Sequence, residues 1–217
     1  MVGKGRTVLV VEDDRLTLGL LAEILTQAGF VVGAADTVAQ ARVMWDRMDP
    51  DAVVLDVDLG PGANGFDLAD AFLAQTPSLG VLFLSTLPDA RFAGRNPDSL
   101  PVGVGYIRKD QISEPKVLVE ALDAVLRGSE MDTPRQDLDP GRPMAELSRT
   151  QIEVLRMVAL GMTNQQIAVE RGTSTRAVHN VLGRTLALIG AEETDEGNAR
   201  VVAAREFIRA AGLPNSF

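Results

Sequence analysis

Five short apolar runs recur along the first half of the chain, and they constrain its fold more than any other feature. Each run is apolar throughout and does not alternate with polar residues, which is typical of parallel strands covered on both faces. Stretches with helical spacing separate the runs, so the order of elements predicts a doubly wound α/β sheet. The predicted strands are Val8–Val11, Val31–Ala34, Ala52–Leu55, Val81–Leu84 and Val104–Ile107.

The remaining elements are predicted to be helices. In the first half, apolar residues from Leu18 to Ala28 share one face, and Gly29 ends that helix. From Leu147 onward every apolar period is helical, and a glycine turn at Gly172 separates two capped helices, which predicts a helix-turn-helix. The other helices are expected at Val38–Met48, Phe66–Ala74, Val117–Leu126, Asn164–Glu170 and Ala199–Ala211, with Ser148, Thr163 and Ser174 as capping residues.

The chain of 217 residues suits two modest domains. Residues 1–127 are predicted to form the α/β domain and residues 145–217 a small all-α domain. Residues 128–144 hold three prolines and few large apolar groups, which indicates a linker. The first domain carries 11 basic and 18 acidic side chains, which argues against nucleic acid there, whereas the second carries 8 of each and permits DNA binding.

Composition excludes several kinds of chemistry. The chain has no cysteine, so disulfides, thiolate metal sites and cysteine nucleophiles are excluded. A single histidine, His179, argues against most histidine metal clusters and against a Ser-His-Asp triad. No apolar run approaches the ~20 residues needed to span a bilayer, and no secretion signal precedes the first strand. We therefore expect a cytoplasmic protein with no membrane partner.

Polar residues follow four of the predicted strands. In a doubly wound sheet, ligands bind at the carboxyl ends of the strands, so these side chains should converge. Three of them are carboxylates, which suit a hard divalent cation such as Mg²⁺. The residues are Glu12 and Asp13 after the first strand, Asp56 after the third, Ser85 after the fourth and Lys109 after the fifth.

This set of side chains predicts a phosphoryl-accepting pocket around Asp56. A metal ion would shield the repulsion between this carboxylate and an incoming phosphoryl group, so that in-line attack becomes possible. Lys109 would offer a positive charge to the new phosphoryl oxygens, and Ser85 would donate a hydrogen bond to one of them. Any one of these residues alone is more often a capping group or a solvated charge, but together they favour the functional interpretation.

The motifs VLVVEDD, DAVVLDVDLG, NGFDLA, VLFLS and GYIRKD resemble the receiver domain of two-component response regulators, over about residues 5–127. The resemblance implies a flavodoxin-like five-stranded domain. It implies that Asp56 accepts a phosphoryl group from a sensor histidine kinase. Glu12 and Asp13 would hold Mg²⁺ together with Asp56 and the backbone carbonyl of Asp58. Ser85 and Tyr106 would form a switch in which the hydroxyl moves to the phosphoryl group and the ring turns inward.

Two segments depart from the family pattern. The turn at residues 60–65 is longer than usual. Residues 87–103 hold three prolines and two glycines where the family has its fourth helix, and both residue types oppose a regular helix. That helix usually belongs to the family's signalling face, so the family's usual route of signal transmission does not follow for this chain.

The segment LSRTQIEVLRMVALGMTNQQIAVERGTSTRAVHNVLGRTLALIGA resembles the DNA-binding domain of LuxR/NarL-type regulators. On its third helix, Val178 and Leu182 begin an inner apolar stripe. The opposite face is polar, as expected of a helix that reads base edges in the major groove. The residues predicted to contact promoter DNA are Arg176, His179, Asn180 and Arg184.

The leading hypothesis is a transcription regulator, phosphorylated on Asp56 and acting on promoter DNA as a homodimer, and not an enzyme. Two alternatives stay open. The irregular residues 87–103 would also fit a phosphorylation-independent regulator with a degraded switch. Asp56 and Asp58 form a DxD pattern that resembles the nucleophile motif of haloacid-dehalogenase-like magnesium phosphatases, although that motif normally lies on the first strand.

Overall fold

The computed structural model describes residues 5–60, 64–191 and 196–214, so residues 61–63 of the long turn after the third strand lie outside the described residues. One five-stranded parallel sheet forms within the described residues, with the strand order β2-β1-β3-β4-β5. All five predicted strands are confirmed, with ends that shift by one residue. The strands are β1 (Thr7–Val11), β2 (Val31–Ala35), β3 (Ala52–Asp56), β4 (Gly80–Ser85) and β5 (Gly105–Arg108).

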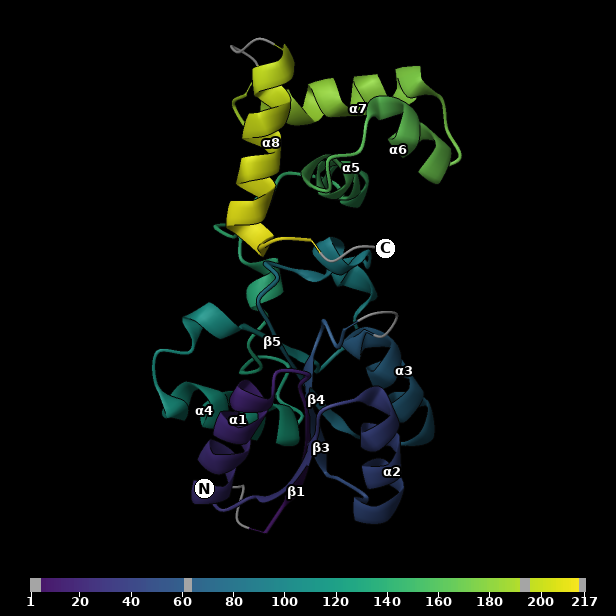
Figure 1. Cartoon of the computed structure of the whole chain (residues 1–217). Helices are drawn as coiled ribbons and strands as arrows, with labels where there is room; N and C mark the ends of the chain where they lie inside the picture. Colours follow the sequence, from purple (N-terminus) through teal and green to yellow (C-terminus); the bar gives the residue numbers. More distant parts are fainter. Residues whose placement is uncertain (1–4, 61–63, 192–195, 215–217) are drawn as a thin grey trace. The chain divides into compact units, whose positions relative to one another are not determined.

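Helices cover both faces of the sheet, which confirms the doubly wound α/β prediction (Figure 1). On one face lie α1 (Arg15–Gln27) and α4 (Pro115–Leu126), packed on strand residues such as Val10 and Leu84. On the other lie α2 (Val38–Met48) and α3 (Gly65–Gln75). There the ring of Phe66 meets the ring of Phe83 edge to face at 4.6 Å. The strands are apolar throughout because each face buries its own layer of side chains.

The register of the sheet brings the carboxyl ends of four strands together. The pairs nearest those ends are Val11 with Leu55, Asp56 with Leu84, and Ser85 with Arg108. The residues that end or follow β1, β3, β4 and β5 therefore lie along one edge of the sheet, as the parallel topology requires.

Residues 87–103 contain no α-helix, as their prolines and glycines predicted. They form two short 3₁₀ helices, η1 (Ala90–Ala93) and η2 (Pro97–Ser99). The side chain of Asp89 caps η1 by accepting a hydrogen bond from the Arg91 amide, and Gly94 ends η1 with a φ of 77°. Glycine adopts this left-handed conformation without the steric cost that other residues incur.

Part of the predicted linker, residues 128–144, runs along the outer edge of β5. The amide of Tyr106 donates a hydrogen bond to the carbonyl of Pro134 at 2.7 Å, and Tyr106 also forms a parallel bridge with Arg135. Two further 3₁₀ helices lie nearby in sequence, η3 (Lys109–Gln111) and η4 (Gln136–Leu138). The edge strand is thus partly covered by the chain itself, which satisfies backbone groups that would otherwise be open to pairing.

The chain divides into two compact units, Met1–Thr86 with Leu100–Asp137, and Leu87–Ser99 with Leu138–Phe217. The helices of the second unit are α5 (Arg149–Ala159), α6 (Asn164–Glu170), α7 (Thr175–Leu188) and α8 (Glu196–Ala211). Capping boxes begin α5 at Ser148 and α6 at Thr163, as the sequence predicted for the caps. Among the described residues, no helix is both long enough and apolar enough to cross a membrane.

Candidate functional site

Three carboxylates meet at the carboxyl edge of the sheet. Glu12 and Asp13 follow β1, Asp56 ends β3, and one oxygen from each lies within 4.8 Å of the others. Glu12 is 1% exposed and Asp56 7% exposed, whereas Asp13 is exposed to solvent. The structure therefore brings together the three carboxylates that the sequence analysis selected. Two of these carboxylates, Glu12 and Asp56, are buried, and the third lies on the solvent-exposed side of the cluster.

Lys109 supplies the positive charge of this cluster. It follows β5 directly, and its Nζ donates hydrogen bonds to Oδ2 of Asp56 at 2.7 Å and to Oε1 of Glu12 at 2.8 Å. The same Nζ lies 2.6 Å from Oε2 of Glu12. One ammonium thus bridges two buried carboxylates from different strands, and this bridge offsets much of their mutual repulsion.

Burial and charge shift the pKa values of all three bridged groups. Burial, followed by the charge of Asp56, raises the pKa of Glu12 to about 7. Burial also raises the pKa of Asp56, although the charge of Lys109 opposes the shift. For Lys109, burial lowers the pKa, but the carboxylates of Asp56 and Glu12 outweigh it and hold the pKa above its usual value. Raised pKa values of this kind are typical of carboxylates buried next to one another and of a lysine held between them.

Gly65, the glycine of the NGFDLA motif, packs against the backbone of Asp56. A Cβ atom at residue 65 would lie 2.0 Å from the carbonyl oxygen of Asp56, far inside van der Waals contact. The Gly65 amide donates to the carbonyl of Val57 at 2.9 Å, and Asn64 caps α3 just before it. The first turn of α3 can approach the end of β3 this closely only because residue 65 lacks a side chain.

Two further acidic residues have distinct roles in this region. Asp58 is exposed, and its backbone amide donates to Oδ1 of Asp56 at 3.2 Å, which orients that carboxylate. Asp14 caps α1 by accepting from the Thr17 amide at 2.8 Å. Hydrogen bonds from Thr17 lower the pKa of Asp14. Asp14 therefore has the helix-capping role typical of an acid at this position.

Ser85 and Tyr106, the residues of the expected switch, are both fully buried. Ser85 ends β4, next to the strand that carries Asp56. The ring of Tyr106 lies with its centroid 6.4 Å from that of Phe83, inside the sheet core. The structure thus has the aromatic ring in an inward position.

The carboxylate cluster fits Mg²⁺ by the chemistry of its donors. Mg²⁺ prefers oxygen ligands, takes few carboxylates and keeps several waters. Glu12, Asp13 and Asp56 supply carboxylate oxygens close enough for one ion, and the exposure of Asp13 leaves a side open to water. No nitrogen or sulfur donor belongs to this cluster among the described residues, which matches a hard cation better than zinc.

The polar face predicted on the third helix of the helix-turn-helix corresponds to the exposed face of α7. Val178 and Leu182 are buried in the core of the second unit. The four residues predicted to contact DNA are exposed: Arg176, His179, Asn180 and Arg184. The side chain of Arg184 turns back along the helix, where its Nε donates to the carbonyl of Asn180 at 3.3 Å. The turn before α7 is made by Gly172, with a φ of 59°.

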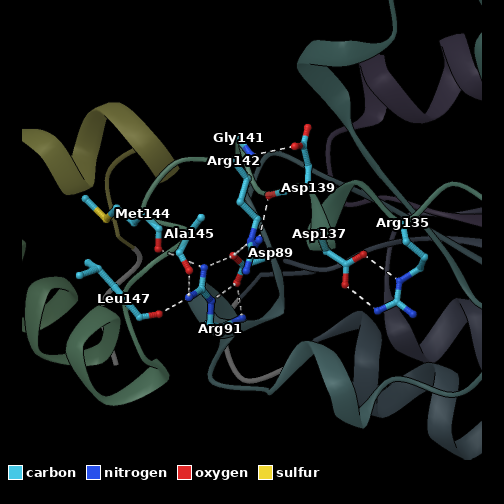
Figure 2. A network of polar contacts seen from close by, with 10 residues as sticks. All are labelled: Asp89, Arg91, Arg135, Asp137, Asp139, Gly141, Arg142, Met144, Ala145 and Leu147. Carbon is cyan, nitrogen blue, oxygen red and sulfur yellow. Dashed lines mark hydrogen bonds and ion pairs between the residues drawn. The ribbon is translucent and has the colours of Figure 1, made fainter. Parts of the chain in front are cut away.

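The ionic residues around η1 were not predicted from the sequence. Asp89, Arg91 and Arg142 form a buried ionic cluster in the second unit (Figure 2). Arg91 bonds mainly to backbone carbonyls more than 50 residues further along the chain. Every residue has a backbone carbonyl, so the sequence does not show which carbonyls accept these hydrogen bonds. The only signal in the sequence is the isolated Asp-Ala-Arg pattern at residues 89–91.

Comparison with known proteins agrees with both halves of the structure. The family model "Response regulator receiver domain" matches residues 8–122, more than half of the chain, and "Bacterial regulatory proteins, luxR family" matches residues 145–196. The DNA-binding transcriptional activator DevR/DosR of Mycobacterium tuberculosis is 30% identical over 75% of this chain and 77% of its own length. The nitrate/nitrite response regulator protein NarP of Escherichia coli is 29% identical over 79% of this chain and 82% of its own.

Solved structures show the same fold. RcsB from Salmonella enterica serovar Typhimurium, bound to promoter DNA in the presence of the phosphomimetic BeF₃⁻, superposes with a TM-score of 0.58 at 19% identity. That match covers 93% of this chain and 98% of the RcsB chain. The carboxylate cluster at the strand ends, the exposed face of α7 and these matches lead to one conclusion. The chain belongs to the response-regulator receiver family, with a LuxR-type regulatory domain after the receiver.

Proposed function

We propose that Asp56 is the phosphoryl acceptor of this DNA-binding response regulator and that a sensor histidine kinase is the donor. One observation carries the proposal: Lys109 bridges Asp56 and Glu12 in a buried cluster with Asp13 beside it. A charge arrangement of this kind, at the carboxyl ends of parallel strands, supports transfer of a dianionic group to a carboxylate. The relatives are transcription regulators, which agrees with a regulatory use of the modification.

The chain's own residues have separate tasks in the transfer. The Asp58 amide holds Oδ1 of Asp56, so the carboxylate keeps one orientation toward the incoming phosphorus. Attack by Asp56 forms an acyl phosphate while the bond to the donor's imidazole breaks. Lys109 then passes from the acceptor carboxylate to a phosphoryl oxygen, and the Ser85 hydroxyl donates to another. Tyr106 would complete the switch with Ser85.

Glu12, Asp13, Asp56 and the carbonyl of Asp58 are the residues that would hold Mg²⁺. When bound, the ion supplies positive charge that offsets the repulsion between the carboxylates and the phosphoryl oxygens. The carboxylate donor set supports this assignment. The chain's part is to hold Glu12 and Asp56 at a fixed distance through Lys109, so that the ion meets a preformed set of oxygens.

For the second unit, we propose that α7 enters the major groove of promoter DNA. Arg176 and Arg184 offer donors for guanine edges or phosphates, and Asn180 offers the paired donor and acceptor that suit adenine. His179 adds a polar surface contact. A homodimer would place two such helices on a pseudo-palindromic operator. A regulator of this kind acts on the chromosome, so we place the protein in the cytoplasm, with regulation and not catalytic turnover as its role.

Intact mass spectrometry tests the acceptor assignment. Incubation with Mg²⁺ and acetyl phosphate should add the mass of one phosphoryl group to the wild-type chain, because Asp56 is the carboxylate that Lys109 and Asp58 orient. Asp56→Asn should show no gain. Asp36→Asn is the matched control, since Asp36 follows β2 and lies outside the cluster, and it should gain mass as the wild type does.

No gain in the wild type would favour the phosphorylation-independent alternative. An equal gain in Asp56→Asn would place the modification elsewhere. Release of many equivalents of phosphate from a phosphate ester by the purified chain would instead support a magnesium phosphatase.

Gly65→Ala tests the close approach of α3 to the acceptor strand. The added methyl group collides with the Asp56 carbonyl oxygen, so the strand end must shift. A displacement of this order at a reacting group can slow a reaction by about 100-fold, and we expect a loss of that order in the phosphorylation rate. Gly19→Ala is the control, because a Cβ at residue 19 meets nothing within 4 Å. An undiminished rate in Gly65→Ala would contradict the assignment.

Salt dependence tests the DNA-binding face. A duplex selected from a random pool by the wild-type protein should bind more weakly to Arg176→Ala and Arg184→Ala. Where the lost contact was to a phosphate, the slope of log K against log salt should fall by about 1. Arg127→Ala removes an exposed arginine after α4, in the first unit, and should leave binding unchanged. Unaltered affinity in both α7 variants would mean that another face of the unit meets DNA.

A further inference from the structure

Residues 87–99 lie in the second compact unit, although they connect two strands of the receiver sheet. Phe92 of η1 is buried in the core of that unit together with Ile152 and Leu155 of α5. Its ring lies 5.6 Å, centroid to centroid, from the ring of Phe207 on α8. A segment between β4 and β5 thus contributes a large apolar side chain to the hydrophobic core that supports the helix-turn-helix.

Arg91 ties the same segment to the residues that lead into α5 (Figure 2). Its Nη1 donates to the carbonyl of Ala145 at 3.1 Å and to the carbonyl of Leu147. Its Nη2 donates to the carbonyl of Met144 at 3.2 Å. The guanidinium also pairs with Asp89, which is 0% exposed, through bonds of 2.9 and 2.5 Å. Every one of these contacts lies inside the second unit.

Two further contacts complete the attachment. Arg142 donates from Nε to the second carboxylate oxygen of Asp89 at 2.8 Å. Arg149, the first residue of α5, donates from Nη1 to the carbonyl of Gly94 at 2.8 Å. A buried carboxylate held by two arginines has a defined position, because any displacement would leave a desolvated charge without its partner. The segment is therefore fixed at both ends of η1 to the start of the helix-turn-helix.

The N-terminal end of residues 87–99 follows β4, the strand next to the one that ends at Asp56. Ser85 is the last residue of β4, and only Thr86 separates it from Leu87, the first residue of the second unit. At its far end the chain returns at Leu100 to the strand that carries Tyr106 and precedes Lys109. The polypeptide thus connects the proposed switch residue covalently with the core of the DNA-binding unit, without passing through residues 128–144.

We propose that residues 87–99 are a built-in coupling arm of the DNA-binding unit, which takes the place of a regular helix after β4. The inference rests on the proposed function. Occupation of the pocket moves the end of β4, the arm carries this movement to η1, and the Arg91 fork passes it to residues 144–147 and the first turn of α5. Arginine suits this position because its planar fork holds several carbonyls in fixed directions, whereas lysine offers a single flexible ammonium.

Amide hydrogen exchange on the full-length chain, with and without Mg²⁺ and BeF₃⁻, tests the coupling. In the wild type, Mg²⁺ and BeF₃⁻ should change the amide exchange rates both in residues 87–95 and in residues 148–155. We expect a change of about fivefold or more, which is the lower end of ordinary allosteric couplings. Asp56→Asn should show neither change. Arg91→Lys should keep the change in residues 87–95 and lose most of that in residues 148–155. Asp98→Asn, an exposed acid on the same segment, is the control and should behave as the wild type.

Several results would overturn the coupling. Loading that alters the exchange of residues 148–155 while residues 87–95 stay unchanged would show another route. If Arg91→Lys showed the full wild-type change in residues 148–155, Arg91 would not be part of the route. If Arg91→Lys does not fold, the wild type and Asp56→Asn still test the arm. The arm requires residues 87–95 and residues 148–155 to change together in the wild type and neither to change in Asp56→Asn. A wild type that gains mass from acetyl phosphate but shows no response in residues 87–95 would refute the arm alone, whereas no mass gain would refute the proposed function and the arm with it.

Discussion

The bridge from Lys109 to the carboxylates of Glu12 and Asp56 is the interaction on which the rest of the receiver depends. Parallel strands bring their carboxyl ends to one edge, and in this chain three of those ends carry acids or the lysine. Two buried carboxylates side by side would repel each other strongly in a medium of low polarity. The ammonium offsets this repulsion, and burial, followed by the charge of Asp56, still raises the pKa of Glu12 to about 7.

This electrostatic cluster needs a rigid support, and the sheet provides it. Strands β1, β3 and β4 are buried on both faces, so their register cannot slip without exposing a whole layer of apolar side chains. Gly65 adds a second constraint, because α3 contacts the backbone of Asp56 where a side chain would collide. Asp56 is thus held by the sheet, by α3 and by Lys109. β4 lies next to the strand that ends at Asp56, and the chain continues from Ser85 into residues 87–99, the proposed coupling arm.

Much of the fold and of the candidate site could be predicted from the sequence. Continuous apolar runs predicted the strands, and the rule that ligands bind at strand ends predicted that Glu12, Asp13, Asp56 and Lys109 lie close together. The exposed polar face of α7 followed from helical periodicity. The attachment of residues 87–99 could not be predicted, because Arg91 binds carbonyls distant in sequence and Phe92 enters a core built elsewhere. The contact between the rings of Tyr106 and Phe83 was not predicted either, because it depends on how β4 and β5 pair.

The central claim is that a preformed carboxylate cluster lets Asp56 accept a phosphoryl group with the help of Mg²⁺. The most direct test is the phosphorylation rate from acetyl phosphate, measured over a range of Mg²⁺ concentrations, in the wild type and in Asp13→Asn. Asp13 is exposed, whereas Glu12 and Asp56 form the bridge with Lys109, so Asp13→Asn removes a proposed metal ligand and leaves the buried bridge intact. The account predicts a rate that rises with Mg²⁺ and saturates in the wild type, and a higher half-saturating concentration in Asp13→Asn. A rate independent of Mg²⁺, or an identical dependence in the two proteins, would contradict it.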